Sequence, residues 1–268
     1  MIYKRIYLEE NNKDVYLDVY AADKVGSFVR NAILVIPGGG YGEVCFEREG
    51  EPIAMAFMPH GYNAFVLHYS VARKKKFPAQ LIEASKAMKH IKDNAEEYNI
   101  NPEKVFVTGF SAGGHLAASL GILWDMKEIY DEINMPYGYN KPAGMILGYP
   151  VISGVSHAHL GSFQNLFCSD EPKKEDLERA SLEKFVSEKS APLFAMHTSN
   201  DSVVDVRNTL SLAAAYREHS LTFELHIYPD APHGVALGNK ITYTDNEKFD
   251  NKHIAKWVNE AAEWAENI

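Results

Sequence analysis

The sequence places a serine between two glycines in Gly109-Phe-Ser-Ala-Gly113, at the junction of two different hydrophobic patterns. The apolar, β-branched run before this motif is typical of a buried strand, and the small residues after it are typical of a closely packed helix. A Gly-x-Ser-x-Gly turn between a strand and a helix exposes the serine hydroxyl on a sharp bend. Ser111 is therefore a candidate nucleophile, and the alternative is a glycine-rich turn that only packs the two elements together.

An activated serine needs a base within hydrogen-bonding reach and an acid that orients the base. Asp201 and His233 each lie in a loop just after an apolar segment that is predicted to form a strand. Because the carboxyl ends of parallel strands meet at the same edge of a sheet, we expect Ser111, Asp201 and His233 to converge there. Asp205 and Asp230 are alternative acids. Asp205 is also placed to cap the following helix, and Asp230 lies too close to His233 in sequence for easy pairing.

Three consecutive glycines, Gly38 to Gly40, follow another apolar segment and offer backbone N–H groups without obstruction by side chains. Such donors stabilise the charge that develops on a carbonyl oxygen during nucleophilic attack. We predict that Gly39, Gly40 and Ala112 form this oxyanion hole. A plain glycine turn and a phosphate-binding loop are the alternatives, and the absence of a Gly-Lys-Ser/Thr ending disfavours the second.

Other side chains carry weaker signals. Tyr41 adjoins the glycines and is predicted to contact substrate. His157 and His159 could supply two metal ligands, but no third ligand follows at a suitable spacing, so no metal is expected. The basic run Arg73–Lys76 is interpreted as a solvated loop, with a basic lip that attracts anionic substrates as the alternative. Phe46, Tyr69 and Tyr149 also lie near predicted strand ends and are further candidates to line the substrate pocket.

Strand and helix patterns alternate through the whole chain, which predicts an α/β fold with a doubly wound, mostly parallel sheet in a single domain, 1–268. Residues 151–189 interrupt the alternation, since they are rich in serine, glycine and charge, with a short helical piece near 181–187. We interpret this insertion as a small cap over the site. The predicted strands cover 2–8, 14–21, 32–36, 63–69, 104–108, 145–149, 192–197 and 222–228, and the predicted helices cover 51–58, 78–95, a segment from the serine to about 124, 206–219 and 254–261.

The composition excludes several classes of protein. The chain has 268 residues, of which 46% are hydrophobic and 24% are charged, so it can form a substantial core. Its net charge of −9 argues against nucleic-acid and anionic-membrane partners. No apolar run reaches the length of about eighteen residues that a membrane helix requires, and the first ten residues lack the apolar core of a signal peptide. Cys45 and Cys168 are far apart in sequence, which favours reduced thiols in a cytoplasmic protein.

Four motifs stand out in the chain: Pro37-Gly-Gly-Gly-Tyr-Gly42, Gly109-Phe-Ser-Ala-Gly-Gly-His-Leu-Ala117, Asn200-Asp-Ser-Val-Val-Asp205 and Tyr228-Pro-Asp-Ala-Pro-His-Gly234. Together they resemble those of α/β-hydrolase esterases. The most similar group is that of the bacterial lipase/esterase and acetyl-xylan-esterase-like proteins, related to hormone-sensitive-lipase-type carboxylesterases. The order of serine, aspartate and histidine also fits this fold. Pro37 stands where the lipases have histidine, and Asp205 stands where a proline is common, but neither change removes a catalytic group.

The resemblance implies a serine carboxylesterase that hydrolyses short acyl esters through an acyl-enzyme, with acetyl groups on sugars among its candidate substrates. It implies no cofactor, and the expected partner is a small ester molecule. A peptidase of the prolyl-oligopeptidase type and a non-catalytic binding protein with the same fold are the alternatives. The sequence leaves the oligomeric state open between a monomer and a homodimer.

Overall fold

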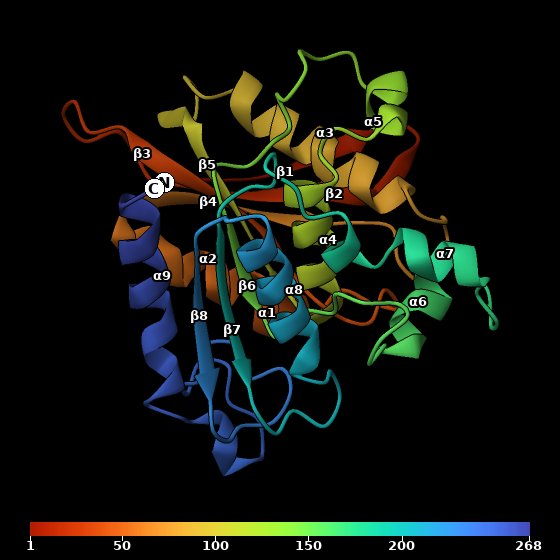
Figure 1. Cartoon of the computed structure of the whole chain (residues 1–268). Helices are drawn as coiled ribbons and strands as arrows, with labels where there is room; N and C mark the ends of the chain where they lie inside the picture. Colours follow the sequence, from red (N-terminus) through yellow and green to blue (C-terminus); the bar gives the residue numbers. More distant parts are fainter.

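The computed structural model describes residues 1–268 and contains one eight-stranded sheet (Figure 1). Its strands are β1 (Ile2–Glu9), β2 (Asn12–Ala21), β3 (Arg30–Ile36), β4 (Tyr62–His68), β5 (Ile100–Phe110), β6 (Met145–Gly148), β7 (Leu193–Thr198) and β8 (Phe223–Tyr228). The strand order is β1-β2-β4-β3-β5-β6-β7-β8. β2 runs antiparallel to both β1 and β4, and every other neighbouring pair is parallel. The predicted mostly parallel α/β fold is confirmed.

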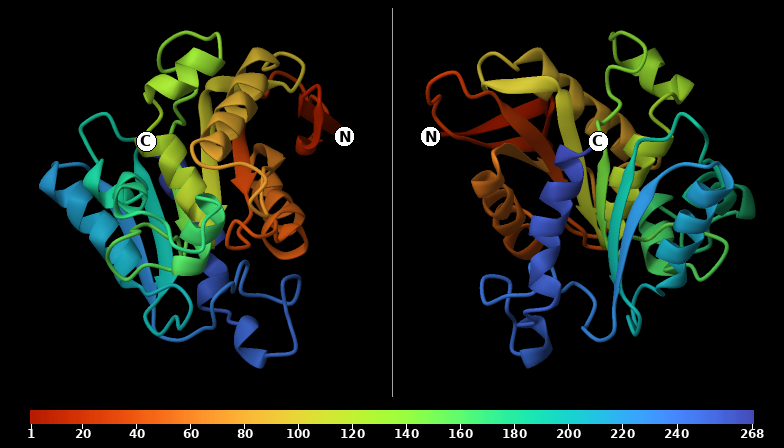
Figure 2. Two further views of the ribbon diagram at one scale, coloured as in Figure 1. Left: turned by 90° about the vertical axis from the view of Figure 1, so that its right-hand side faces the viewer. Right: turned by 60° about the vertical axis from the view of Figure 1, so that its left-hand side comes forward.

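Helices cover both faces of the sheet (Figure 2). Successive side chains of a strand point to opposite faces, so β3 buries Leu34 and Ile36 in one core and Ile33 and Val35 in the other. The larger core also contains apolar side chains of α3 (Ala79–Asp93), α4 (Ser111–Ile122) and α8 (Arg207–Glu218), and the smaller one contains those of α2 (Glu51–Phe57) and α9 (Trp257–Glu266). No helix is both long enough and apolar enough to span a membrane.

Short helices account for most differences from the prediction. The insertion 151–189 holds α6 (Leu160–Leu166), α7 (Lys174–Arg179) and the 3₁₀ turn η2 (Leu182–Lys184), where one helical piece near 181–187 is predicted. These helices and α5 (Lys127–Glu132) have only six or seven residues, and α7 buries none of them. An apolar stripe needs several turns to become visible in a sequence, so the pattern gives no signal for them. The remaining short elements are α1 (Phe46–Glu49), η1 (Met58–His60), η3 (Glu247–Phe249) and η4 (Ile254–Lys256).

The carboxyl ends of the parallel strands gather their loops at one edge of the sheet, where the arrowheads of β7 and β8 point in Figure 1. The residues predicted to do chemistry lie in the loops that follow β3, β7 and β8 and at the junction of β5 with α4. Phe163 of α6 packs edge-on against His115 of α4, whose N-terminus is at this edge. The fold therefore brings segments that are far apart in sequence to one place.

Candidate active site

Ser111 lies at the junction of β5 and α4, with 7% of its surface exposed. Its φ of +52° falls in the left-handed region, which is strained for a residue with a side chain. The flanking glycines make this turn possible: a Cβ on Gly109 would collide with the carbonyl of Gly113, and a Cβ on Gly113 would collide with the carbonyl of Ile36. The sharp strand-to-helix turn predicted from the motif is confirmed.

Ser111, His233 and Asp201 form one chain of hydrogen bonds. His233 Nε2 is 2.9 Å from Ser111 Oγ, and His233 Nδ1 is 2.7 Å from Asp201 Oδ2. The Asp201 side chain is fully buried, and that of His233 is 14% exposed. An imidazole between a hydroxyl and a carboxylate can take a proton from the hydroxyl while the carboxylate fixes its tautomer.

The carboxylate of Asp201 has four hydrogen-bond donors around it. Oδ1 accepts the N–H groups of Val203 and Val204, both at 2.9 Å. Oδ2 faces His233 and also lies 3.2 Å from Nε2 of His197, a buried histidine at the end of β7. Burial acts to raise the pKa of Asp201, but the hydrogen bonds from His197 and His233 outweigh it and hold this pKa well below its usual range. Asp201 therefore stays ionised at neutral pH.

The two alternative acids are engaged elsewhere. Asp205 accepts the backbone N–H of Arg207, the first residue of α8, and pairs with the Arg207 guanidinium. Asp230 accepts hydrogen bonds from Asn200 and Lys248. Neither carboxylate is hydrogen-bonded to His233, so Asp201 is the acid that the geometry joins to the imidazole.

The glycine loop after β3 presents free donors beside Ser111. A Cβ on Gly38 would stand only 3.0 Å from Ser111 Cβ, which shows how closely the loop approaches the serine. Gly39 and Gly40 have φ values of +124° and +62°, and their N–H groups donate to no backbone carbonyl. Ala112 lies in the first turn of α4, where N–H groups have no partner within the helix. The N–H groups of Gly39, Gly40 and Ala112, which are predicted to form the oxyanion hole, therefore donate to no backbone carbonyl.

A buried carboxylate that the sequence analysis did not identify holds this loop. Glu49 is 1% exposed, and its Oε2 accepts the N–H of Gly38 at 2.8 Å while its Oε1 accepts the hydroxyl of Tyr149 at 2.8 Å. The Tyr149 hydroxyl in turn accepts the N–H of Ala236, and its ring packs edge-on against the ring of His233 at 4.9 Å. Glu49 thus connects the glycine loop to the loop that carries the imidazole. In a four-residue helix no apolar period reveals that this glutamate faces inward.

The structure places Tyr41 differently from the prediction. It is predicted to contact substrate, but its side chain is 2% exposed and its hydroxyl lies 2.8 Å from Nδ1 of His115. His115 Nε2 lies 2.8 Å from the carbonyl of Ala180, and burial lowers the pKa of His115 to about 4. The neutral ring therefore donates from Nε2 to Ala180 and accepts the Tyr41 hydroxyl at Nδ1. Tyr41 therefore supports the glycine loop from inside the protein.

The other aromatic candidates also face inward. The Tyr69 hydroxyl donates to the carbonyl of Pro37, and Tyr149 is buried beneath His233. Phe46 is half-buried and packs on His68. An aromatic residue near a strand end is as readily part of the support of the site as part of its wall, and the sequence does not distinguish the two.

The insertion 151–189 contacts the glycine loop. Asn165 of α6 donates to the carbonyl of Gly40 at 2.9 Å, and His159 just before α6 is hydrogen-bonded to Ser162 at 2.8 Å. Burial, with the charge of the nearby His233, lowers the pKa of His159. No group of three His, Cys, Asp or Glu side chains is arranged to hold a metal ion.

Every residue of the basic run 73–76 forms an ion pair: Arg73 with Asp170, Lys74 with Asp14, Lys75 with Glu9 and Glu83, and Lys76 with Asp176. The run therefore leaves no free basic lip.

Both cysteines are free thiols. A cavity of about 760 Å³ is lined by Lys240, Tyr243, Glu247 and Asp250 and includes no residue of the hydrogen-bonded chain.

Three comparisons relate this geometry to known proteins. The model of the BD-FAE family matches residues 17–216. Endo-1,4-beta-xylanase B of Butyrivibrio fibrisolvens is 39% identical over 215 residues, which cover 78% of this chain and 33% of that protein. Acetylxylan esterase of Xylanibacter ruminicola is 29% identical over 232 residues, which cover 85% of this chain and 45% of that protein. The chain thus spans less than half the length of these two relatives.

A solved structure matches over nearly the whole chain. The crystal structure of an acetyl ester-xyloside bifunctional hydrolase from Caldicellulosiruptor lactoaceticus has a TM-score of 0.85 and 33% identity, and the match covers 98% of this chain and 96% of that one. The resemblance to acetyl-xylan-esterase-like α/β-hydrolases that the motifs indicate is confirmed.

Proposed function

The chain belongs to the BD-FAE family, and from this premise we propose that it is a serine carboxylesterase that hydrolyses short-chain acyl esters, among them acetyl groups on sugars. The single observation that carries the proposal is the continuous chain of hydrogen bonds from Ser111 through His233 to Asp201. The names of the relatives support the substrate class, since one is an acetylxylan esterase and one acts on acetyl esters and xylosides.

The proposed reaction proceeds through an acyl-enzyme. Ser111 Oγ attacks the ester carbonyl while its proton passes to His233 Nε2, and Asp201 stabilises the imidazolium. The N–H groups of Gly39, Gly40 and Ala112 then receive the oxyanion of the tetrahedral intermediate. When the intermediate collapses, the C–O bond to the alcohol breaks, and the proton on His233 passes to the leaving oxygen.

Water completes the cycle. His233 takes a proton from a water molecule, the resulting hydroxide attacks the acyl carbon, and the bond to Ser111 Oγ breaks as His233 returns the proton to it. The products are the carboxylic acid and the free serine. No step of this scheme requires a metal ion or an organic cofactor.

We further propose a cytoplasmic location, because the free thiols of Cys45 and Cys168 suit a reducing compartment, and assembly as a monomer or homodimer. The insertion 151–189, through the contact of Asn165 with the glycine loop, is proposed to act as a small cap on the site.

Replacement of the nucleophile tests the proposal. Ser111→Ala should lower kcat for p-nitrophenyl acetate by about 10⁴-fold or more, because attack by the hydroxyl is lost. It should also abolish labelling by a fluorophosphonate probe. Ser27→Ala, at an exposed serine before β3, is the matched control and should keep both properties. Activity of Ser111→Ala within a few-fold of wild type would contradict the proposal.

A further inference from the structure

His197, the last but one residue of β7, is a fully buried histidine to which the proposed reaction gives no role. Its Nε2 lies 3.0 Å from the carbonyl oxygen of Val204 and 3.2 Å from Oδ2 of Asp201. Its Nδ1 lies 2.7 Å from Oγ1 of Thr209, a buried residue in the first turn of α8. Both ring nitrogens therefore have partners, and the ring is held between the strand, the acid loop and the helix.

These contacts also fix the position of the ring proton. Both neighbours of Nε2 are acceptors, so Nε2 must carry a hydrogen and donate it. In the neutral ring Nδ1 is then the acceptor, and the Thr209 hydroxyl is the donor that it requires. His197 thus presents an N–H group to the carboxylate of Asp201, and Thr209 keeps that N–H group in place.

The oxygen Oδ2 of Asp201 lies between two imidazole rings. His233 Nδ1 is 2.7 Å from it and His197 Nε2 is 3.2 Å from it, while Oδ1 accepts two backbone N–H groups. Without His197, His233 would be the only side-chain donor to this oxygen. A second donor stabilises the carboxylate and disperses the negative charge that acts on His233.

We infer that His197 is a positioning residue of the proposed esterase, because it fixes the carboxylate that orients His233 and weakens the hold of that carboxylate on the protonated imidazole. Asp201 must stabilise the imidazolium during attack, but too strong a pairing would keep the ring protonated before the reaction begins. The N–H group of His197 offsets part of this attraction. The inference rests on the proposed esterase function and adds a residue to the hydrogen-bonded chain that carries it.

Two other basic side chains lie near His233 without a hydrogen bond to it. His159 belongs to the insertion and is hydrogen-bonded to Ser162. Arg48 belongs to α1, and its Nη2 would be 2.8 Å from a Cβ on Gly234, the residue after His233. Both side chains therefore act on the imidazole only through space.

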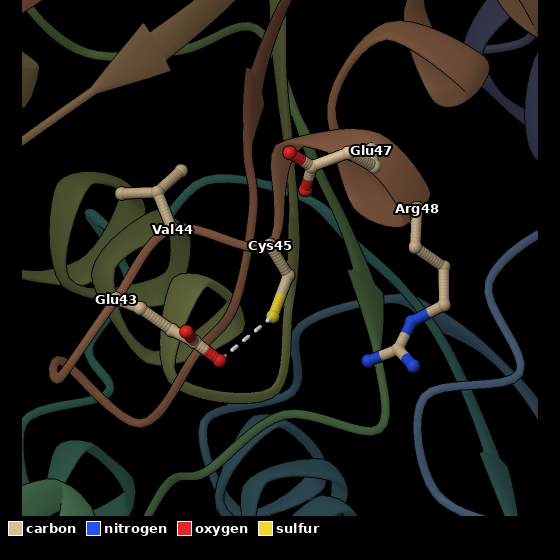
Figure 3. Close-up of a pocket in the computed structure, with 5 residues that line it drawn as sticks. All are labelled: Glu43, Val44, Cys45, Glu47 and Arg48. Atoms are coloured by element: carbon tan, nitrogen blue, oxygen red, sulfur yellow. Dashed lines mark hydrogen bonds between the residues drawn. The ribbon is translucent and has the colours of Figure 1, made fainter.

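The glutamates of the segment around α1 make no hydrogen bond to this imidazole either. Figure 3 shows the carboxylates of Glu43 and Glu47 set apart from the Arg48 guanidinium. Glu49 lies 3.8 Å from Arg48 and accepts the hydroxyl of Tyr149, whose ring packs edge-on against the same imidazole. A change in the pH profile on replacement of the buried histidine in β7 therefore reports on its own contact with the acid.

Two replacements separate the donor of His197 from its shape. His197→Gln can place an amide N–H group where Nε2 donates, and His197→Phe fills a similar space without a donor. We measure kcat and KM for p-nitrophenyl acetate between pH 5 and pH 8.5. His197→Phe should raise the apparent pKa of the kcat/KM profile by about half a unit to one unit and lower kcat roughly tenfold, with KM little changed. His197→Gln should restore most of both values.

Thr209→Val is a second variant that keeps the buried ring and changes only its tautomer. Valine removes the hydroxyl that donates to Nδ1, so the proton can move there and leave Nε2 as an acceptor that faces the carboxylate. The apparent pKa should rise in the same direction as in His197→Phe. The matched control is His90→Phe, at a half-buried histidine of α3 that is hydrogen-bonded to Tyr98. It should lower the midpoint of urea denaturation and leave the pH profile unchanged.

A purely structural role would lower the stability of His197→Phe and Thr209→Val and leave the apparent pKa at its wild-type value, and this result would overturn the inference. If His197→Phe does not fold, the pH profile of Thr209→Val decides alone. In either case turnover by the wild-type protein and labelling of Ser111 would leave the esterase proposal standing. If the wild-type protein shows neither, the esterase proposal fails and the inference fails with it.

Discussion

The two sides of Ser111 are held in place by different kinds of contact. On the acid side, every partner of Asp201 except His233 lies within four residues of it in the chain. On the oxyanion side, the glycine loop depends on side chains from three separate elements, Glu49 of α1, His115 of α4 and Asn165 of α6. The predicted acid is therefore positioned by a local motif, and the predicted oxyanion donors are positioned by side chains packed from several elements at this edge of the sheet. Substitutions remote from the serine should affect the second side more than the first.

The largest effect is expected where the local motif itself changes. Asp201→Asn can still accept the two backbone N–H bonds, but it favours the wrong imidazole tautomer and cannot stabilise the imidazolium. We expect kcat for p-nitrophenyl acetate to fall by about 10⁴-fold with the fold retained, as checked by circular dichroism. Asp205→Asn is the matched control and should stay near wild type. A greater loss in Asp205→Asn would mean that the acid side is assigned to the wrong carboxylate.

A smaller loss is expected when the packing that holds the glycine loop is weakened. Glu49→Gln keeps only one acceptor oxygen, so either the Gly38 N–H or the Tyr149 O–H loses its acceptor. We expect kcat to fall roughly tenfold, less than the loss of a complete oxyanion donor. KM should change little, because Glu49 positions the loop and does not touch substrate. Glu51→Gln should match wild type in both constants, and a rise in KM with unchanged kcat would contradict a positioning role.

His115 makes the oxyanion side sensitive to acid. Its pKa in the folded protein is about 4, below the ordinary value near 6.5, so between these values the unfolded chain binds the additional proton. The stabilisation by neutral His115 is complete above about pH 6.5 and is lost as the pH falls toward 4. Over that range it amounts to roughly 3 kcal/mol of the free energy of unfolding.

Urea denaturation at pH 7 and pH 5 tests this dependence. His115→Asn should be less stable than wild type at pH 7, and the difference between the two proteins should shrink at pH 5, because the variant lacks the titrating ring. His219→Asn, at an exposed histidine, should lose as much stability between the two pH values as wild type does. A constant difference between His115→Asn and wild type would exclude a titrating role for His115.

The same contrast explains what the sequence could predict. The sheet follows from long apolar segments, and the convergence of Ser111, Asp201 and His233 follows from parallel topology, because each residue directly follows a strand. The geometry agrees with that expectation, and the roles of these residues remain a prediction until activity is measured. Local rules of turn and strand chemistry were sufficient for this part.

The support of the glycine loop could not be predicted in the same way. Glu49 and His115 act through partners about eleven and seventy-four positions away, and no periodicity links such pairs. Tyr41 shows the consequence, since its position beside the glycines suggested substrate contact while packing turned its ring inward. The short helices of the insertion were missed because they bury too few residues to produce a pattern.

The substitution with the smallest expected effect, Tyr41→Phe, gives the most direct test of the difference between the two sides of Ser111. Tyr41→Phe keeps the ring edge-on to Tyr69 but removes the hydroxyl bonded to His115, so one buried acceptor loses its donor. We expect a loss of about 1 kcal/mol in the free energy of unfolding and a few-fold loss in kcat. Because the bond joins the glycine loop to α4, Tyr41→Phe and His115→Asn should couple by about 1 kcal/mol in a double-mutant cycle measured by urea denaturation. Strictly additive losses would show that the glycine loop is held as locally as Asp201, and the distinction between the two sides would fail.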